Sequence, residues 1–284
     1  MKHRLSIVVP FLALVLAACS GSGSSPSTSA AATSAPSAVP SAAGSSGAAL
    51  TVYGAASLKA ALTKAKAAYE TANPGMTVTI STDSSSALET QIEQGAPADV
   101  FLSADATNPQ KLVDKGLAAG GLVPFAGNKL TIVVPSANPA GITSPKDLAN
   151  PGVKVIAAGD SVPITRYATQ LVGNLAREAG YPADFVAKYT ANIASKEDNV
   201  AALLSKIALD QGDAGIVYVT DATGAADTVK TIDVPDSANV PAAYDGVVIK
   251  ASQNPVAAKA FLDWFAGPDG QAILTGLGFL PPAS

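Results

Sequence analysis

Cysteine and histidine are almost absent from this chain, and the few that occur lie at its start. Among the 284 residues the only histidine is His3 and the only cysteine is Cys19. The remainder therefore has no internal disulfide, no Ser-His-Asp or Cys-His catalytic centre, and no zinc site built on thiolate or imidazole. A hydrolase would need Ser-Lys or carboxylate chemistry, and the sequence offers no compact constellation for either.

Long hydrophobic runs are also lacking. The apolar run at residues 5–16 follows a basic start and is too short to span a bilayer, which is typical of a signal peptide. Its end, Leu-Ala-Ala-Cys at 16–19, resembles the lipobox of bacterial lipoproteins. That resemblance implies cleavage after residue 18 and diacylation of Cys19, which would be the only membrane attachment. An ordinary secretory signal with an incidental Cys19 is the alternative.

Residues 20–49 contain no charged and no aromatic side chain, only Ser, Ala, Gly, Pro, Thr and one Val. Such a segment buries too little apolar surface to offset the entropy lost on ordering. We therefore expect a signal peptide at 1–18, and a lipidated Cys19 followed by a disordered tether at 19–49.

Basic residues are outnumbered by acidic ones. Loss of residues 1–18 would remove two of the 18 basic side chains and none of the 22 acidic ones, so the formal charge would change from −4 to −6. This balance argues against nucleic-acid binding and against a broad positive field that attracts anions. Any anion site must therefore be local and built from dipoles.

From residue 50 onward, short β-rich runs alternate with segments of helical periodicity, which predicts an α/β protein. We expect strands at 50–53, 78–80, 100–102, 130–134, 153–157, 215–218 and 244–250, with helices after 57, after 84, near 112, and at 167–179, 200–209 and 255–265. Phe261, Trp264 and Phe265 are expected in the core. Asp99 and Asp105, which flank a strand, are expected to cap a helix or face solvent rather than to act in catalysis.

The length suits two lobes of ordinary domain size. We expect two doubly wound α/β lobes joined by two hinge segments, with residues 50–128 plus 246–284 in the first lobe and 129–245 in the second. The connecting segments are expected near 129–134 and 244–249, with a cleft between the lobes. Ligands of open α/β sheets bind beyond the carboxyl ends of the strands, so the cleft is where a ligand is expected.

Hydroxyl groups and helix starts follow the predicted strands at five places. Ser57 and the cluster 84–86 open two helices, the turn 159–163 and the pair 198–199 precede two more, and Tyr218 ends a strand. A helix N-terminus carries free N–H groups and roughly half a positive charge, so four of them supply about two. The pattern predicts a receptor for a dianion that uses neutral donors.

Six stretches of the chain carry a resemblance to a known family. They read AASL (55–58), SSSALETQIEQGAPADVFLSAD (84–105), GNKLTIVVP (127–135), GDSVPITRYA (159–168), DNVAALL (198–204) and DAGIVYVTDA (213–222). In this order they resemble the substrate-binding proteins of bacterial molybdate ABC importers, over about residues 50–280. GAPADVF followed by DAGIVY is the most specific part of the pattern.

The resemblance implies a type II periplasmic-binding-protein fold that captures molybdate, and tungstate similarly, without catalysis. The implied donors are the amides and hydroxyls of Ser57 and Ser85, the amides of Ile164 and Val200, and the phenol of Tyr218. No cofactor and no side-chain ligand of a metal cation is implied. The implied partner is a membrane permease driven by a cytoplasmic ATPase, and the receptor itself is expected to be a monomer.

One departure from the family pattern falls at this site. Relatives often have Pro-Ala-Gly where this chain has Pro163-Ile164-Thr165. A backbone donor survives a change of side chain, so binding is expected to persist. The alternatives are a receptor for sulfate, phosphate or an organic anion, a hydrolase without histidine, and a purely structural surface lipoprotein.

Overall fold

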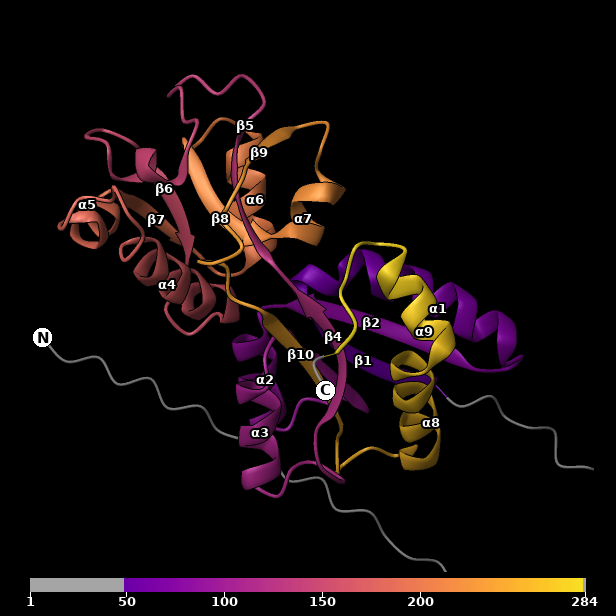
Figure 1. Cartoon of the computed structure of the whole chain (residues 1–284). Helices are drawn as coiled ribbons and strands as arrows, with labels where there is room; N and C mark the ends of the chain where they lie inside the picture. Colours follow the sequence, from indigo (N-terminus) through magenta and orange to yellow (C-terminus); the bar gives the residue numbers. More distant parts are fainter. Residues whose placement is uncertain (1–48, 283–284) are drawn as a thin grey trace, which may run out of the picture. The chain divides into compact units, whose positions relative to one another are not determined.

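The computed structural model describes residues 49–282, which form two α/β lobes, each built on a five-stranded sheet (Figure 1). The predicted leader, the lipidated Cys19 and the tether lie outside the described residues, apart from Ala49, which begins the first strand. In the described part of the chain no helix is long and apolar enough to cross a membrane.

The first sheet is mixed. Its strand order is β2-β1-β3-β10-β4, where β1 is Ala49–Ala55, β2 Thr77–Asp83, β3 Val100–Ser103, β4 Val123–Asn128 and β10 Ala242–Val248. Strand β1 pairs in parallel with β2 and β3, as the alternation of strands and helices predicted. Strand β10 lies antiparallel between β3 and β4, because the chain re-enters this lobe in the opposite direction.

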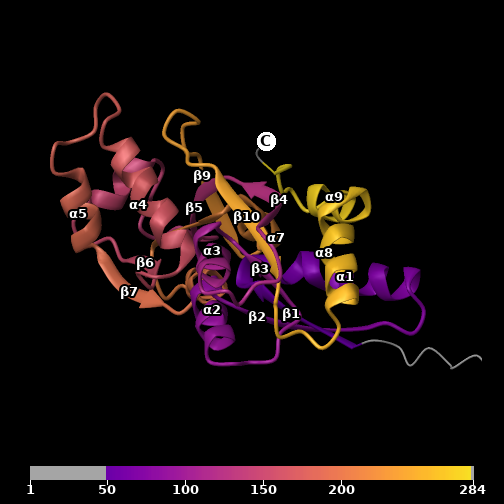
Figure 2. The ribbon, with the colours of Figure 1, turned by 90° about the horizontal axis from the view of Figure 1, so that it is seen from below.

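Helices cover both faces of this sheet, as Figures 1 and 2 show. On one face lie α1 (Lys59–Ala72), α8 (Pro255–Ala266) and α9 (Pro268–Thr275), and on the other α2 (Ser85–Glu93) and α3 (Thr107–Asp114). Phe261 and Phe265 are buried in the core as predicted, whereas Trp264 is partly buried against Tyr69, with ring centroids 5.0 Å apart.

The second lobe repeats the arrangement with the sheet order β7-β6-β8-β5-β9. The strands are β5 (Leu130–Pro135), β6 (Val155–Ala158), β7 (Ile193–Glu197), β8 (Ala214–Tyr218) and β9 (Val229–Ile232). The helices are η2 (Pro145–Ala149), α4 (Pro163–Leu175), α5 (Phe185–Ala191), α6 (Val200–Ala208) and α7 (Val219–Gly224). Strand β6 runs parallel to β7 and β8, and β5 antiparallel to β8 and β9.

The chain crosses between the lobes twice. It leaves β4 at Asn128 and enters β5 at Leu130, and it returns between the end of β9 at Ile232 and the start of β10 at Ala242. The two segments expected to connect the lobes, 129–134 and 244–249, therefore belong mostly to strands β5 and β10. The chain passes from one lobe to the other just before each of these strands. Strand β10 already pairs with β4 at Ala242, upstream of the crossing expected between residues 245 and 246.

Several elements have no counterpart in the sequence predictions. Strands β7 and β9 are edge strands with few buried positions, so the apolar alternation that marks a strand is weak in both. Strand β4 contains Pro124 and Gly127, which are poor strand formers. Helix α4 does have a predicted counterpart, but it begins at Pro163 at the end of the predicted turn rather than near Tyr167, since proline suits the first position of a helix.

Candidate functional site

All five residues predicted to bind an anion line one small cavity between the two lobes. Ser57 and Ser85 come from the first lobe, and Ile164, Val200 and Tyr218 come from the second. Each lies just beyond, or at, the carboxyl end of a strand. The cavity is also lined by the short turns around these residues, and no lysine or arginine is among its lining residues. Their role as donors remains a prediction.

Ser57 lies in η1 (Ala56–Leu58), a single 3-10 turn that joins β1 to α1, and not at the first position of the α-helix itself. The side chain is buried and its Oγ lies 3.0 Å from the phenolic oxygen of Tyr244. Tyr244, on β10, is fully buried, and the sequence predictions missed it. No local pattern marks it, because the contact spans 187 positions of the chain.

Ser85 is the first residue of α2, and Ser84 caps that helix by accepting a hydrogen bond from the N–H of Ala87 at 3.3 Å. The Ser85 Oγ accepts a hydrogen bond from the N–H of Ala104 at 3.0 Å. This bond fixes the oxygen and leaves the hydroxyl proton available as a donor, since a hydroxyl both accepts and donates. Ser85 is almost completely buried, so the donor lies in a water-poor position.

Two backbone amides come from helix starts of the second lobe. Val162 caps α4 and Pro163 occupies its first position, which places the N–H of Ile164 in the first turn. Asn199 caps α6 by accepting a bond from the N–H of Ala202 at 3.0 Å, so Val200 is the first helical residue. First-turn N–H groups have no partner within their own helix. Both amides are therefore free to bind an anion.

Tyr218 ends β8, and its phenolic oxygen is buried without a hydrogen-bond partner. Burial raises the pKa of Tyr218 above its ordinary value, so the phenol stays protonated and can donate. A buried hydroxyl without a partner costs free energy unless a ligand satisfies it. Among the five candidates, this side chain gives the clearest indication of a missing polar ligand.

The arginine two residues beyond Ile164 is already engaged. Arg166, on α4, forms an ion pair with the carboxylate of Asp105, and its Nη1 donates to Thr107 Oγ1 at 2.5 Å. Asp105 lies one residue before the N-cap of α3 and accepts from the N–H of Asn108 in the first turn of that helix at 2.9 Å. Asp99 is buried as well and accepts from the N–H of Thr51 at 2.7 Å, so neither aspartate faces solvent. An anion in the cavity would therefore be held by neutral donors.

The sequence and the fold are both similar to those of known proteins. The model of one family, described as bacterial extracellular solute-binding protein, matches residues 50–280. The chain belongs to this family. The match confirms the prediction of a solute receptor rather than an enzyme, and it confirms the predicted fold of two α/β lobes.

Individual relatives of this solute-binding protein carry more specific names. It is 35% identical over 233 residues to the molybdate-binding protein ModA of Mycobacterium tuberculosis, covering 82% of this chain and 85% of the relative. It is 29% identical to a putative ABC transporter substrate-binding lipoprotein, YvgL, of Bacillus subtilis, covering 81% and 85%. The solved structure of the periplasmic molybdate-binding protein of Azotobacter vinelandii aligns with a TM-score of 0.70 at 26% identity, covering 82% of this chain and all of that one. The predicted resemblance is confirmed by these matches.

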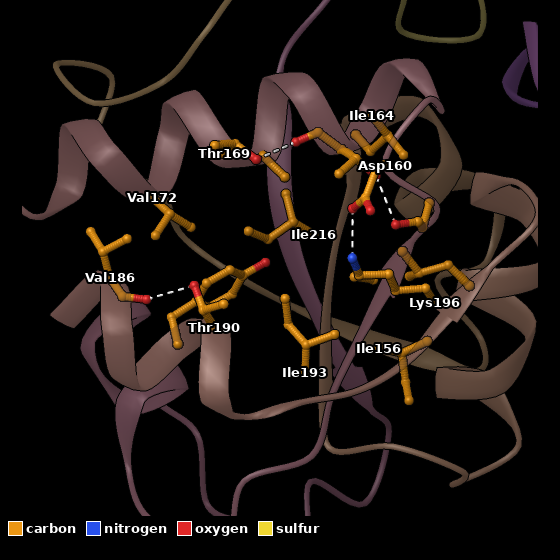
Figure 3. A pocket seen from close by; sticks show the side chains of 16 residues that line it. Ile156, Asp160, Ile164, Thr169, Val172, Val186, Thr190, Ile193, Lys196 and Ile216 are labelled. Carbon is orange, nitrogen blue, oxygen red and sulfur yellow. Dashed lines mark hydrogen bonds and ion pairs between the residues drawn. The ribbon is translucent and has the colours of Figure 1, made fainter. Parts of the chain in front are cut away.

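A second cavity of the solute-binding protein lies within the second lobe, between α4, α5 and the sheet (Figure 3). Its volume is about 190 Å³ and its lining is mostly apolar, with Val172, Ile193 and Ile216 pointing into it. Lys196 at its edge is paired with Asp160 at 2.6 Å. An apolar cavity desolvates an anion without offering it donors, so the inter-lobe cavity is the better anion site.

Asp221, in the first turn of α7, was also missed by the sequence predictions. Its Oδ2 is buried without a partner, although the residue as a whole is partly exposed. Burial raises the pKa of this carboxyl to about 7, and a hydrogen bond with the backbone of Tyr218 partly opposes this increase. The carboxyl is therefore largely protonated below neutral pH in the folded protein.

This pKa predicts how stability changes with pH. Between about pH 4 and pH 7 the unfolded chain loses the Asp221 proton while the folded chain keeps it, so the free energy of unfolding falls as the pH rises. Asp221→Asn replaces the titrating carboxyl with a neutral amide, so this fall in the free energy of unfolding should disappear. Relative to wild type, we expect the variant to gain about 1–2 kcal/mol between pH 4.5 and pH 7.5 in urea unfolding. The exposed Asp227→Asn serves as the control, and equal pH profiles for Asp221→Asn and wild type would refute the assignment.

Proposed function

We propose that this protein captures molybdate, and tungstate similarly, outside the cytoplasm and delivers it to an ABC importer. The observation that carries the proposal is the convergence of five neutral donors from both lobes on one small cavity. The relatives named as molybdate-binding proteins support the choice of ligand. Protein groups that are fixed before the ligand arrives compensate an anion at little reorganisation cost.

In this proposal the lobes close on the ligand and each supplies part of its coordination. The amides and hydroxyls of Ser57 and Ser85 bind from the first lobe. The amides of Ile164 and Val200 and the phenol of Tyr218 bind from the second lobe. Because neither lobe holds a complete set of donors, binding stabilises the closed arrangement over any open one. No covalent step occurs.

Selectivity among tetrahedral dianions is the test of the proposed ligand. Sulfate has the same charge and geometry, so discrimination must come from the size of a rigid cavity. In equilibrium dialysis of the purified protein, we expect bound molybdate to survive about a hundredfold excess of sulfate or phosphate, while an equimolar amount of tungstate displaces about half of it. Displacement by sulfate at equal concentration would instead support the alternative of a sulfate receptor.

We also propose a location for the protein, based on its first 49 residues. Residues 1–18 act as a signal peptide, Cys19 is diacylated, and residues 19–49 tether the two lobes to the outer face of the membrane beside the permease. The extracellular family and the lipoprotein relative support this placement. Fractionation of cells that express wild type or Cys19→Ala tests it, because the variant should leave the membrane fraction. An unchanged distribution would favour an ordinary secretory signal.

A further inference from the structure

Outside the cavity, polar side chains connect the two lobes at several places, and two of these connections lie beside the candidate donors. Arg166 of the second lobe reaches the first lobe, where it pairs with Asp105 and donates to Thr107. Asn199 of the second lobe donates through Nδ2 to Asp83 Oδ1 of the first lobe at 2.9 Å. These contacts can form only when the lobes lie close together.

The connecting side chains are neighbours of the candidate donors. Arg166 lies two residues beyond Ile164, and Asn199 directly precedes Val200. On the opposite lobe, Asp105 follows Ala104, whose N–H holds the Ser85 hydroxyl. A movement that breaks these contacts therefore also separates the donors of one lobe from those of the other.

The carboxylate of Asp105, which pairs with Arg166, has other hydrogen-bond partners within its own lobe. Asp105 Oδ1 also accepts hydrogen bonds from the N–H of Asn108 at 2.9 Å and from the hydroxyl of Ser103 at 3.0 Å, both in its own lobe. The side chain of Arg166 is 39% exposed, so it would be hydrated when the lobes separate. Separation then leaves no buried charge without a partner, and the ion pair contributes to closure rather than to the stability of either lobe.

We propose that Arg166 is a positioning residue that latches the lobes and sets how long the oxyanion stays bound. The proposal rests on the proposed function, since it presumes that the lobes close around an oxyanion. The ligand leaves only after the lobes separate, so a contact present only in the closed state slows dissociation. Arg166 touches no ligand in this proposal and acts through closure alone.

The test is the rate at which preloaded protein releases labelled molybdate into an excess of unlabelled molybdate, measured by rapid filtration. We expect Arg166→Gln to raise the dissociation rate about fivefold, equivalent to about 1 kcal/mol, with little change in the association rate. Arg166→Lys keeps the charge but not the second contact, so its rate should lie between those of Arg166→Gln and wild type. Raising the salt concentration should speed release from wild type and leave Arg166→Gln unaffected.

The control is Arg177→Gln, the same substitution at an exposed arginine of the same lobe, whose side chain contacts Asn174 and does not reach the first lobe. It should release molybdate at the wild-type rate. Equal rates for Arg166→Gln and wild type would overturn the latch while leaving the receptor intact. Failure of wild-type protein to retain molybdate at all would instead overturn the proposed function. Urea unfolding of each variant, expected to match wild type, separates both results from a folding defect.

Discussion

Replacing Val200 by proline is expected to weaken molybdate binding by about 10- to 100-fold while leaving the fold intact. Proline removes one N–H, and a hydrogen bond to a charged group is worth about 1.5–3 kcal/mol. The substitution suits the position, because Val200 is the first residue of α6 and proline is favoured there. Asn199 before it is already extended, with φ −156° and ψ 171°, close to what a residue preceding proline requires.

The matched control for this position is Val200→Ala. Alanine keeps the N–H and removes two methyl groups, so the affinity should remain within about threefold of wild type while stability falls by about 1 kcal/mol. Titration calorimetry gives the affinities, and circular dichroism checks that helix α6 is retained. Wild-type affinity in Val200→Pro would show that this amide is not a ligand donor.

Tyr218→Phe is expected to move stability and affinity in different directions. The phenolic oxygen is buried without a partner, so its removal should leave the free energy of unfolding of the unliganded protein unchanged or slightly raised. The same change should lower the affinity for molybdate by about 10- to 100-fold, because one ligand oxygen loses its donor. Urea unfolding and titration calorimetry measure the two effects separately.

Tyr189→Phe is the control for this second substitution. Tyr189 is a buried tyrosine of the same lobe, but it lines the apolar cavity and not the cavity between the lobes. Its loss of a hydroxyl should leave molybdate affinity unchanged. If Tyr218→Phe also binds like wild type, the phenol does not reach the ligand, and the site needs a different donor from the second lobe.

Parts of this site were predictable from the sequence because the signals behind them are local. Ser84 and Asn199 are capping residues, and Pro163 fits the first position of a helix. Each of them therefore predicts a helix start within a few residues. The apolar run at 130–134 marked β5 for the same reason. Such features depend on neighbours along the chain, and the structure contains all of them.

Other parts could not be predicted, because they depend on residues that are far apart in the sequence. The contact of Tyr244 with Ser57 and the ion pair of Arg166 with Asp105 both join segments that only the folded chain brings together. The antiparallel position of β10 between β3 and β4 belongs to the same group. None of these leaves a periodic or capping pattern in the sequence.

The sequence by itself therefore determined most of the buried strands, the helix starts marked by capping residues or proline, and that no histidine or thiol chemistry operates beyond residue 19. Only the tertiary structure decided that the five candidate donors share one cavity, that the nearby arginine is occupied by an aspartate, and which buried polar atoms lack a partner. The reason is physical: helix starts and strands follow from interactions between near neighbours, whereas burial and the pairing of charges depend on how the two sheets and their helices pack.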